Sequence, residues 1–128
     1  MSNLLNSLLA GASGGGGGTG LTFEIVTTTT KVMGVNYEYV ANNSSLVSLE
    51  LPTIADAGDK IIIRGWGAGG WKLLQNASQY IKAGNSTTTV GAGGYIQSVD
   101  QYDVIELTCI ITNNGWNAIF QQGTMTII

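Results

Sequence analysis

The chain holds few side chains that could do acid–base or nucleophilic chemistry. It has eight acidic residues, a single cysteine and no histidine. Without histidine there is no Ser-His-Asp triad, no Cys-His pair and almost no route to a catalytic zinc site. We therefore expect no enzyme activity.

The remaining acid–base candidates are two pairs of aspartates, Asp56 with Asp59 and Asp100 with Asp103. A glycosidase would need two carboxyl groups facing each other across a cleft. Both pairs lie in short turn-like stretches, where Asp commonly accepts hydrogen bonds from its own backbone. Turn formation is the favoured interpretation. Calcium binding is the alternative, although the spacing matches no known calcium loop.

The only cysteine, Cys109, lies inside the apolar run from Val104 to Ile111. A free cysteine in such a run behaves as a small buried hydrophobic residue. We expect a structural thiol, no intrachain disulfide and no cysteine-based metal site. The sequence indicates no cofactor.

The segment Gly65–Gly70 matches the dinucleotide-binding pattern G-x-G-x-x-G in form only. That function requires a following helix and an acidic residue about 20 positions later. Residues 71–75 read as a strand instead, and residues 83–95 contain no Asp or Glu. We expect a tight loop in which the missing side chains allow close backbone approach.

Aromatic residues among Asn, Gln and Gly form a second candidate site; they are Trp66, Trp71, Tyr80, Tyr95, Tyr102 and Trp116. Trp66, Trp71 and Tyr80 are the possible glycan contacts, because aromatic faces with amide neighbours suit sugars. Core packing explains the same residues, and both interpretations stay open.

The strands and loops that would position these residues belong to a chain with few charged side chains. Only 10% of its residues are charged, against roughly 25% in an ordinary soluble domain. Its net charge of −3 and five scattered cations argue against nucleic acid, which needs clustered Lys and Arg. No apolar run approaches the roughly 20 residues of a membrane span. A surface of hydroxyl and amide groups suits an assembled extracellular protein.

Three zones follow one another along the chain. Residues 1–13 form a Leu-rich peptide with a one-sided apolar stripe made by Leu4, Leu5, Leu8 and Leu9. A helix this short is marginal alone, so we expect the stripe to dock on a partner; a frayed terminus is the alternative. A cleaved signal peptide is disfavoured, because the start lacks a basic region. Residues 14–20 form a glycine tether.

Residues 21–128 are rich in Thr, Val, Ile and Tyr, with turn residues recurring every eight to twelve positions or so. No helical period appears after residue 20, and Asn113-Asn-Gly115 predicts a hairpin turn. We expect an all-β domain, a β-sandwich or a jelly-roll-like barrel. The expected strands cover residues 21–32, 36–41, 46–51, 59–64, 71–75, 79–82, 87–90, 94–99, 104–112, 116–121 and 124–128.

From about Tyr37 onward, an ordered set of short motifs resembles the C-terminal domain of bacteriophage tail and head fibres and related receptor-binding proteins. The motifs are Leu49-Glu-Leu-Pro52, Gly58-Asp59, Ile61-Ile-Ile-Arg-Gly-Trp-Gly67, Gly70-Trp-Lys-Leu-Leu-Gln75, Gln79-Tyr-Ile-Lys-Ala-Gly84, Thr87-Thr-Thr-Val-Gly91, Tyr95-Ile-Gln-Ser98, Asp103-Val-Ile-Glu-Leu-Thr-Cys109 and Asn114-Gly-Trp116. The resemblance implies a trimeric, non-catalytic module on the surface of a virion. The long shaft that usually precedes such domains is absent from this sequence.

The leading hypothesis is therefore a homo-oligomeric virion protein, a fibre or capsid-decoration module that residues 1–13 attach to a capsid or tail protein. It could also contact a host-surface glycan. One alternative is a carbohydrate-binding adhesin. Another is a self-assembling extracellular filament, in which the N-terminal segment inserts into the next subunit.

Overall fold

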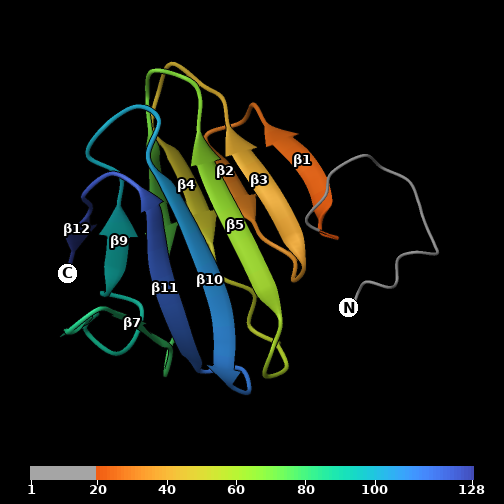
Figure 1. Ribbon diagram of the computed structural model, residues 1–128, viewed down its shortest axis with the longest axis vertical. Coiled ribbons are helices and arrows are strands. Elements are labelled where there is room, and N and C mark those ends of the chain that lie inside the picture. The colour runs from red at the N-terminus through yellow and green to blue at the C-terminus, as the bar shows by residue number, and fades with distance from the viewer. Residues whose placement is uncertain (1–19) are drawn as a thin grey trace.

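The computed structural model describes residues 20–128, which fold into two stacked β-sheets (Figure 1). The larger sheet has seven strands in the order β1-β3-β5-β10-β11-β7-β8, and the smaller has five in the order β12-β9-β6-β4-β2. The strands are β1 (Thr22–Val26), β2 (Thr30–Val32), β3 (Tyr37–Ala41), β4 (Val47–Glu50), β5 (Lys60–Gly65), β6 (Trp71–Leu74), β7 (Tyr80–Ala83), β8 (Ser86–Thr87), β9 (Tyr95–Gln97), β10 (Val104–Ile111), β11 (Gly115–Gln122) and β12 (Thr126–Ile127).

The first half of this domain winds between the sheets, changing sheet with every strand. β1, β3 and β5 pair in parallel in the larger sheet, and β2, β4 and β6 pair in parallel in the smaller one. Figure 1 shows β2 and β4 behind β3 and β5. From β1 to β6, each odd-numbered strand and the even-numbered strand that follows it thus form one coil, and successive coils stack side by side.

The second half closes the sandwich with mainly antiparallel pairs; β7 and β11 are the parallel exception. β10 pairs with β5 on one side and with β11 on the other. The β10–β11 connection is the expected hairpin, with Asn113 in the left-handed region at φ 67°. The predicted β-sandwich is confirmed. The jelly-roll alternative is not, because half of the strand pairings are parallel, whereas a jelly roll is built from antiparallel Greek keys.

Two expected strands were wrong in their extent. Residues 21–32 were predicted as a single strand, but β1 and β2 belong to different sheets, and residues 27–29 connect them. A Thr-rich run favours extended backbone throughout, and nothing local marks the point where the chain changes sheet. Residues 87–90 were predicted as a strand, but β8 covers only Ser86–Thr87, and residues 88–90 are irregular. The other expected strands are present.

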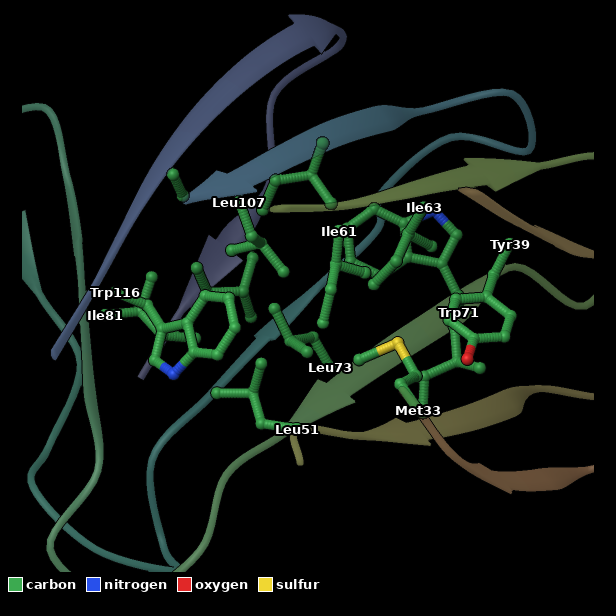
Figure 2. Packing of buried hydrophobic residues seen from close by; sticks show 14 of the residues in the cluster. Met33, Tyr39, Leu51, Ile61, Ile63, Trp71, Leu73, Ile81, Leu107 and Trp116 are labelled. Atoms are coloured by element: carbon green, nitrogen blue, oxygen red, sulfur yellow. The ribbon is translucent and has the colours of Figure 1, made fainter. Parts of the chain in front are cut away.

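The core lies between the two sheets and comes from alternate residues of each strand (Figure 2). Trp71 and Leu73 of β6 face Ile61 and Ile63 of β5, and all four are fully buried. Trp116 of β11 fills the region next to Ile81. Alternation in β10 predicts that Ile105, Leu107, Cys109 and Ile111 face inward. The first three are buried, but Ile111 is 53% exposed, because the register shifts between Cys109 and Ile111.

At the first coil, formed by β1 and β2, the core ends at a pair of charged side chains. Glu24 and Lys31 lie at core-facing positions, because their strand partners Tyr39 and Leu49 are both buried core residues. They form an ion pair of 3.0 Å, and the hydrogen bond to Glu24 raises the pKa of Lys31. Inward-pointing charges on edge strands discourage the addition of another strand. The β1/β2 edge is therefore protected.

Candidate functional site

The glycine segment after β5, residues 66–70, is a loop whose backbone lies in close contact with the loop of residues 42–46. The backbone N–H groups of Trp66 and Gly67 both donate to the carbonyl of Ala41 at 3.0 Å, and Gly69 donates to Asn43 at 3.0 Å. A Cβ on Gly67 or Gly69 would overlap the backbone of Asn43 or Ser45. β6 follows directly, so the expectation of a close-approach loop is confirmed.

This loop presents Trp66 to solvent beside Tyr102. The two side chains are 62% and 56% exposed, and their rings meet edge to face with centroids 5.8 Å apart. The Gln101 side chain donates to the Trp66 carbonyl at 3.0 Å and so connects the two loops. Trp66 and Tyr102, here called the aromatic loop pair, form the candidate ligand-contact site.

Asp103 holds the loop that carries Tyr102. Its buried carboxylate accepts hydrogen bonds from the N–H groups of Val99 at 2.8 Å and Asp100 at 2.9 Å. Its backbone carbonyl accepts bonds from the Gly65 N–H and the Trp71 indole N–H, each at 3.0 Å. These five residues tie the loop to both sheets.

The other aspartate pair behaves in the same way. The Asp59 carboxylate accepts the Asp56 N–H at 2.9 Å and the Asn36 side-chain amide at 3.1 Å. The expected turn chemistry is thus present at both pairs. Within residues 20–128, no three Cys, Asp or Glu side chains lie close enough together to hold a metal ion.

The structure does not bring the three predicted glycan contacts together. Trp66 is exposed as described, but Trp71 is fully buried in the core and has no free ring face. The prediction for Trp71 is corrected: it was based on the glycine loop, whereas Trp71 already belongs to β6 and faces inward. Tyr80 is half-buried at the opposite end, paired with Gly115 near the β10–β11 turn.

Sequence reasoning missed Tyr102 as the partner of Trp66. The signal was available, because Tyr102 lies inside the Asp100–Asp103 turn, and a side chain in such a turn points outward when the aspartates bond the backbone. The contact itself depends on two loops that are 35 residues apart meeting at one end of the sandwich.

Two further groups have a shifted pKa, the Cys109 thiol and the Tyr39 hydroxyl, and both lie in the core. Burial raises the pKa of the Cys109 thiol, which confirms the expected buried cysteine. Burial likewise raises the pKa of Tyr39, whose hydroxyl accepts the Gly34 N–H at 2.7 Å. Both groups therefore stay protonated at neutral pH.

The Leu-rich docking peptide, residues 1–13 with Leu4, Leu5, Leu8 and Leu9, lies outside the described residues, as does the tether except for Gly20. Within residues 20–128, no helix is long and apolar enough to cross a membrane. No family model matches the chain, and no curated protein matches it in sequence. Function is therefore inferred from the surfaces described above and from the motif resemblance.

Proposed function

We propose that this chain is a non-enzymatic structural module of a bacteriophage particle, a homo-oligomer displayed on the virion surface as a fibre or capsid-decoration protein. The resemblance to fibre C-terminal domains implies three copies. In this proposal, residues 1–13 attach the module to a capsid or tail protein, and the sandwich is the rigid displayed part.

The observation that carries the proposal is the apolar character of the surface. Thirteen large hydrophobic side chains among residues 20–128 are more than one third exposed. Several are neighbours, such as Phe23 with Ile25 on β1 and Trp66 with Tyr102. Single exposed hydrophobic residues are normal, but neighbouring ones mark contact surfaces. Since the aspartate pairs serve their own turns, this surface suits contact better than catalysis.

The first test is the solution mass of the full chain by light scattering, with and without residues 1–20. A stable oligomer in both forms supports a self-assembling β domain that carries a separate attachment peptide. A full chain that stays monomeric over the accessible concentration range overturns the proposal.

Attachment is tested with purified particles. Removing residues 1–13 should leave the oligomer folded and abolish its binding to particles that lack it. Normal decoration by the shortened chain would remove the attachment role of the peptide.

A second candidate function, glycan binding, is favoured by the aromatic loop pair. Two exposed aromatic rings on firmly held loops can pack on a sugar face, and they cost little side-chain entropy when they bind. We expect glycan-array binding to be lost with Trp66→Ala and with Tyr102→Ala. Tyr80→Ala at the opposite end is the control. A folded wild-type protein that binds no glycan contradicts this function.

The filament alternative has less support, because it needs an edge that accepts the next subunit. At the β1/β2 edge the Glu24–Lys31 ion pair occupies the place where another core layer would begin. Open-ended fibres formed by the purified chain would restore this alternative.

A further inference from the structure

The seven-stranded sheet carries apolar side chains on both of its faces, although the outer face also holds charged residues. Val40, Ile62 and Val104 lie outside the core cluster between the sheets, yet each is less than 10% exposed. On the same outer face, Phe23 and Ile119 are more than half exposed. Strands that are apolar on both faces are typical of sheets covered on both sides. In Figure 1 this face points toward the viewer, and no other strand of residues 20–128 lies in front of it.

The five-stranded sheet provides the contrast. Its core-facing residues alternate with outward positions. Most of these hold polar side chains, namely Thr30, Ser48, Glu50, Lys72 and Gln97, and the others are Val32, Leu74 and Tyr95. This is the usual pattern of a sheet with one solvated face. The outer face of the larger sheet thus holds more apolar side chains than the outer face of the smaller one.

The charges on the outer face are arranged around Ile62. Strand register places Glu38 of β3 and Glu106 of β10 on either side of Ile62. Lys60 and Arg64 lie two residues before and after it on β5. Arg64 pairs with Glu38, and Lys60 pairs with Glu106 at 3.6 Å. The four charges thus alternate in sign around a central isoleucine.

We propose that a second copy of this chain covers this outer face, in a face-to-face contact centred on Ile62. This inference rests on the proposed homo-oligomer and names one interface of it; a two-fold contact gives an even number of copies, in place of the three that the resemblance implies. Because the signs alternate around Ile62, an identical face turned by about a quarter turn places each glutamate over a cation of the other copy. Sheets do pack at such near-orthogonal angles.

The same strand register places apolar side chains beyond the glutamates. Phe23 lies opposite Glu38, and Ile119 lies opposite Glu106. The row therefore reads apolar, Glu, Ile62, Glu, apolar. A two-fold contact requires one surface patch to be complementary to itself. The four alternating charges around Ile62 meet that condition, because after the quarter turn each glutamate faces a cation and each cation faces a glutamate.

The desolvation of the charges does not prevent the contact. A charge that becomes buried without a partner is costly. Here each of the four charges around Ile62 is already paired within its own chain, so a contact centred on Ile62 leaves none of these four unpaired. The cross-copy pairs then contribute mainly to orientation and specificity.

The test is sedimentation equilibrium of the full chain and of three variants. Phe23→Lys and Ile119→Lys place a lysine on the outer face directly opposite Glu38 or Glu106. Val32→Lys is the matched control, because it places a lysine opposite Glu50 on the outer face of the other sheet. All three changed side chains are exposed, so each variant should fold, which circular dichroism and thermal unfolding check.

We expect wild type to form an even number of copies. Phe23→Lys and Ile119→Lys should weaken self-association by about tenfold or more, as expected for buried apolar contacts, and Val32→Lys by less than about twofold. A trimer whose mass and affinity are unchanged in both outer-face variants overturns this interface and leaves the proposed function standing. A wild-type monomer overturns both.

Discussion

The indole N–H of Trp71 donates a hydrogen bond of 3.0 Å to the backbone carbonyl of Asp103. This bond joins β6 in the five-stranded sheet to the loop that carries Tyr102. Trp71, which sequence reasoning proposed as a ligand contact, therefore supports the ligand-contact site from inside the core.

The two buried tryptophans should respond differently to replacement by phenylalanine. Trp71 and Trp116 are both almost fully buried. Among residues 20–128, the indole N–H of Trp116 has no hydrogen-bond partner. Trp71→Phe removes a hydrogen bond and leaves a buried carbonyl with one fewer donor, whereas Trp116→Phe removes none. We expect Trp71→Phe to lower the free energy of unfolding by about 1 kcal/mol more than Trp116→Phe, measured by urea denaturation. Equal losses would contradict the role assigned to the bond.

The Asp103 carboxylate should be essential for the loop of residues 98–103. Asp103→Ala leaves the N–H groups of Val99 and Asp100 without their acceptor. Bonds to a charged acceptor contribute about 1.5–3 kcal/mol each, so we expect a loss of about 2 kcal/mol or more in thermal or urea unfolding. The exposed neighbour Asp100 is the control, since Asp100→Ala should change stability by less than about 0.5 kcal/mol. An Asp103→Ala protein as stable as this control would disprove the assignment.

The glycine loop should not tolerate a side chain at its contact points. Gly69→Ala brings a Cβ into the backbone of Ser45, and we expect a loss of about 2 kcal/mol or more. Gly93→Ala has nothing within 4 Å of its new Cβ and needs no left-handed backbone, so its effect should stay within about 0.5 kcal/mol. Thermal unfolding of the two variants provides the comparison, and similar melting temperatures would contradict the close approach.

Stability should decline at alkaline pH because of Cys109. Burial raises the pKa of this thiol in the folded state, so the folded chain keeps a proton that the unfolded chain releases near pH 8.5. The contribution of the protonated thiol to the free energy of unfolding is complete below about pH 8.5 and is lost as the pH rises toward the raised pKa. Urea denaturation from pH 7.5 to 9.5 measures the decline, which should flatten in Cys109→Ala. Rapid reaction of the native thiol with a disulfide reagent at pH 8 would contradict the burial.

Much of the secondary structure was predictable because strand formation is a local property. β10 and β11 are visible in the sequence through the alternation of apolar and polar residues and the Asn113-Asn-Gly115 turn. The same alternation correctly predicts Ile105, Leu107 and Cys109 as inward residues, but it wrongly predicts Ile111, which lies after a register shift and is exposed. The choice of partner strand is not local. Nothing in residues 21–32 shows that β1 and β2 separate into two sheets, since that depends on the coils formed later by β3 and β4.

The candidate site was predicted only in part, for a related reason. Trp66 and Trp71 flank the same glycine segment and look alike in the sequence. Tertiary structure separates them, because β6 begins at Trp71 and turns it into the core, while Trp66 lies in the loop beside Tyr102.

Composition and alternation by themselves determined that this chain is an all-β protein with little charge and a buried thiol. Only the tertiary structure decided which faces stay open. Gln75, a polar residue by sequence, is buried because its amide donates to the carbonyls of Gln79, Thr89 and Gly91. Ile62, an apolar residue, lies on the outer face among four charges. Local pattern specifies a strand and its two faces, whereas the stacking of distant strands determines which face becomes the core.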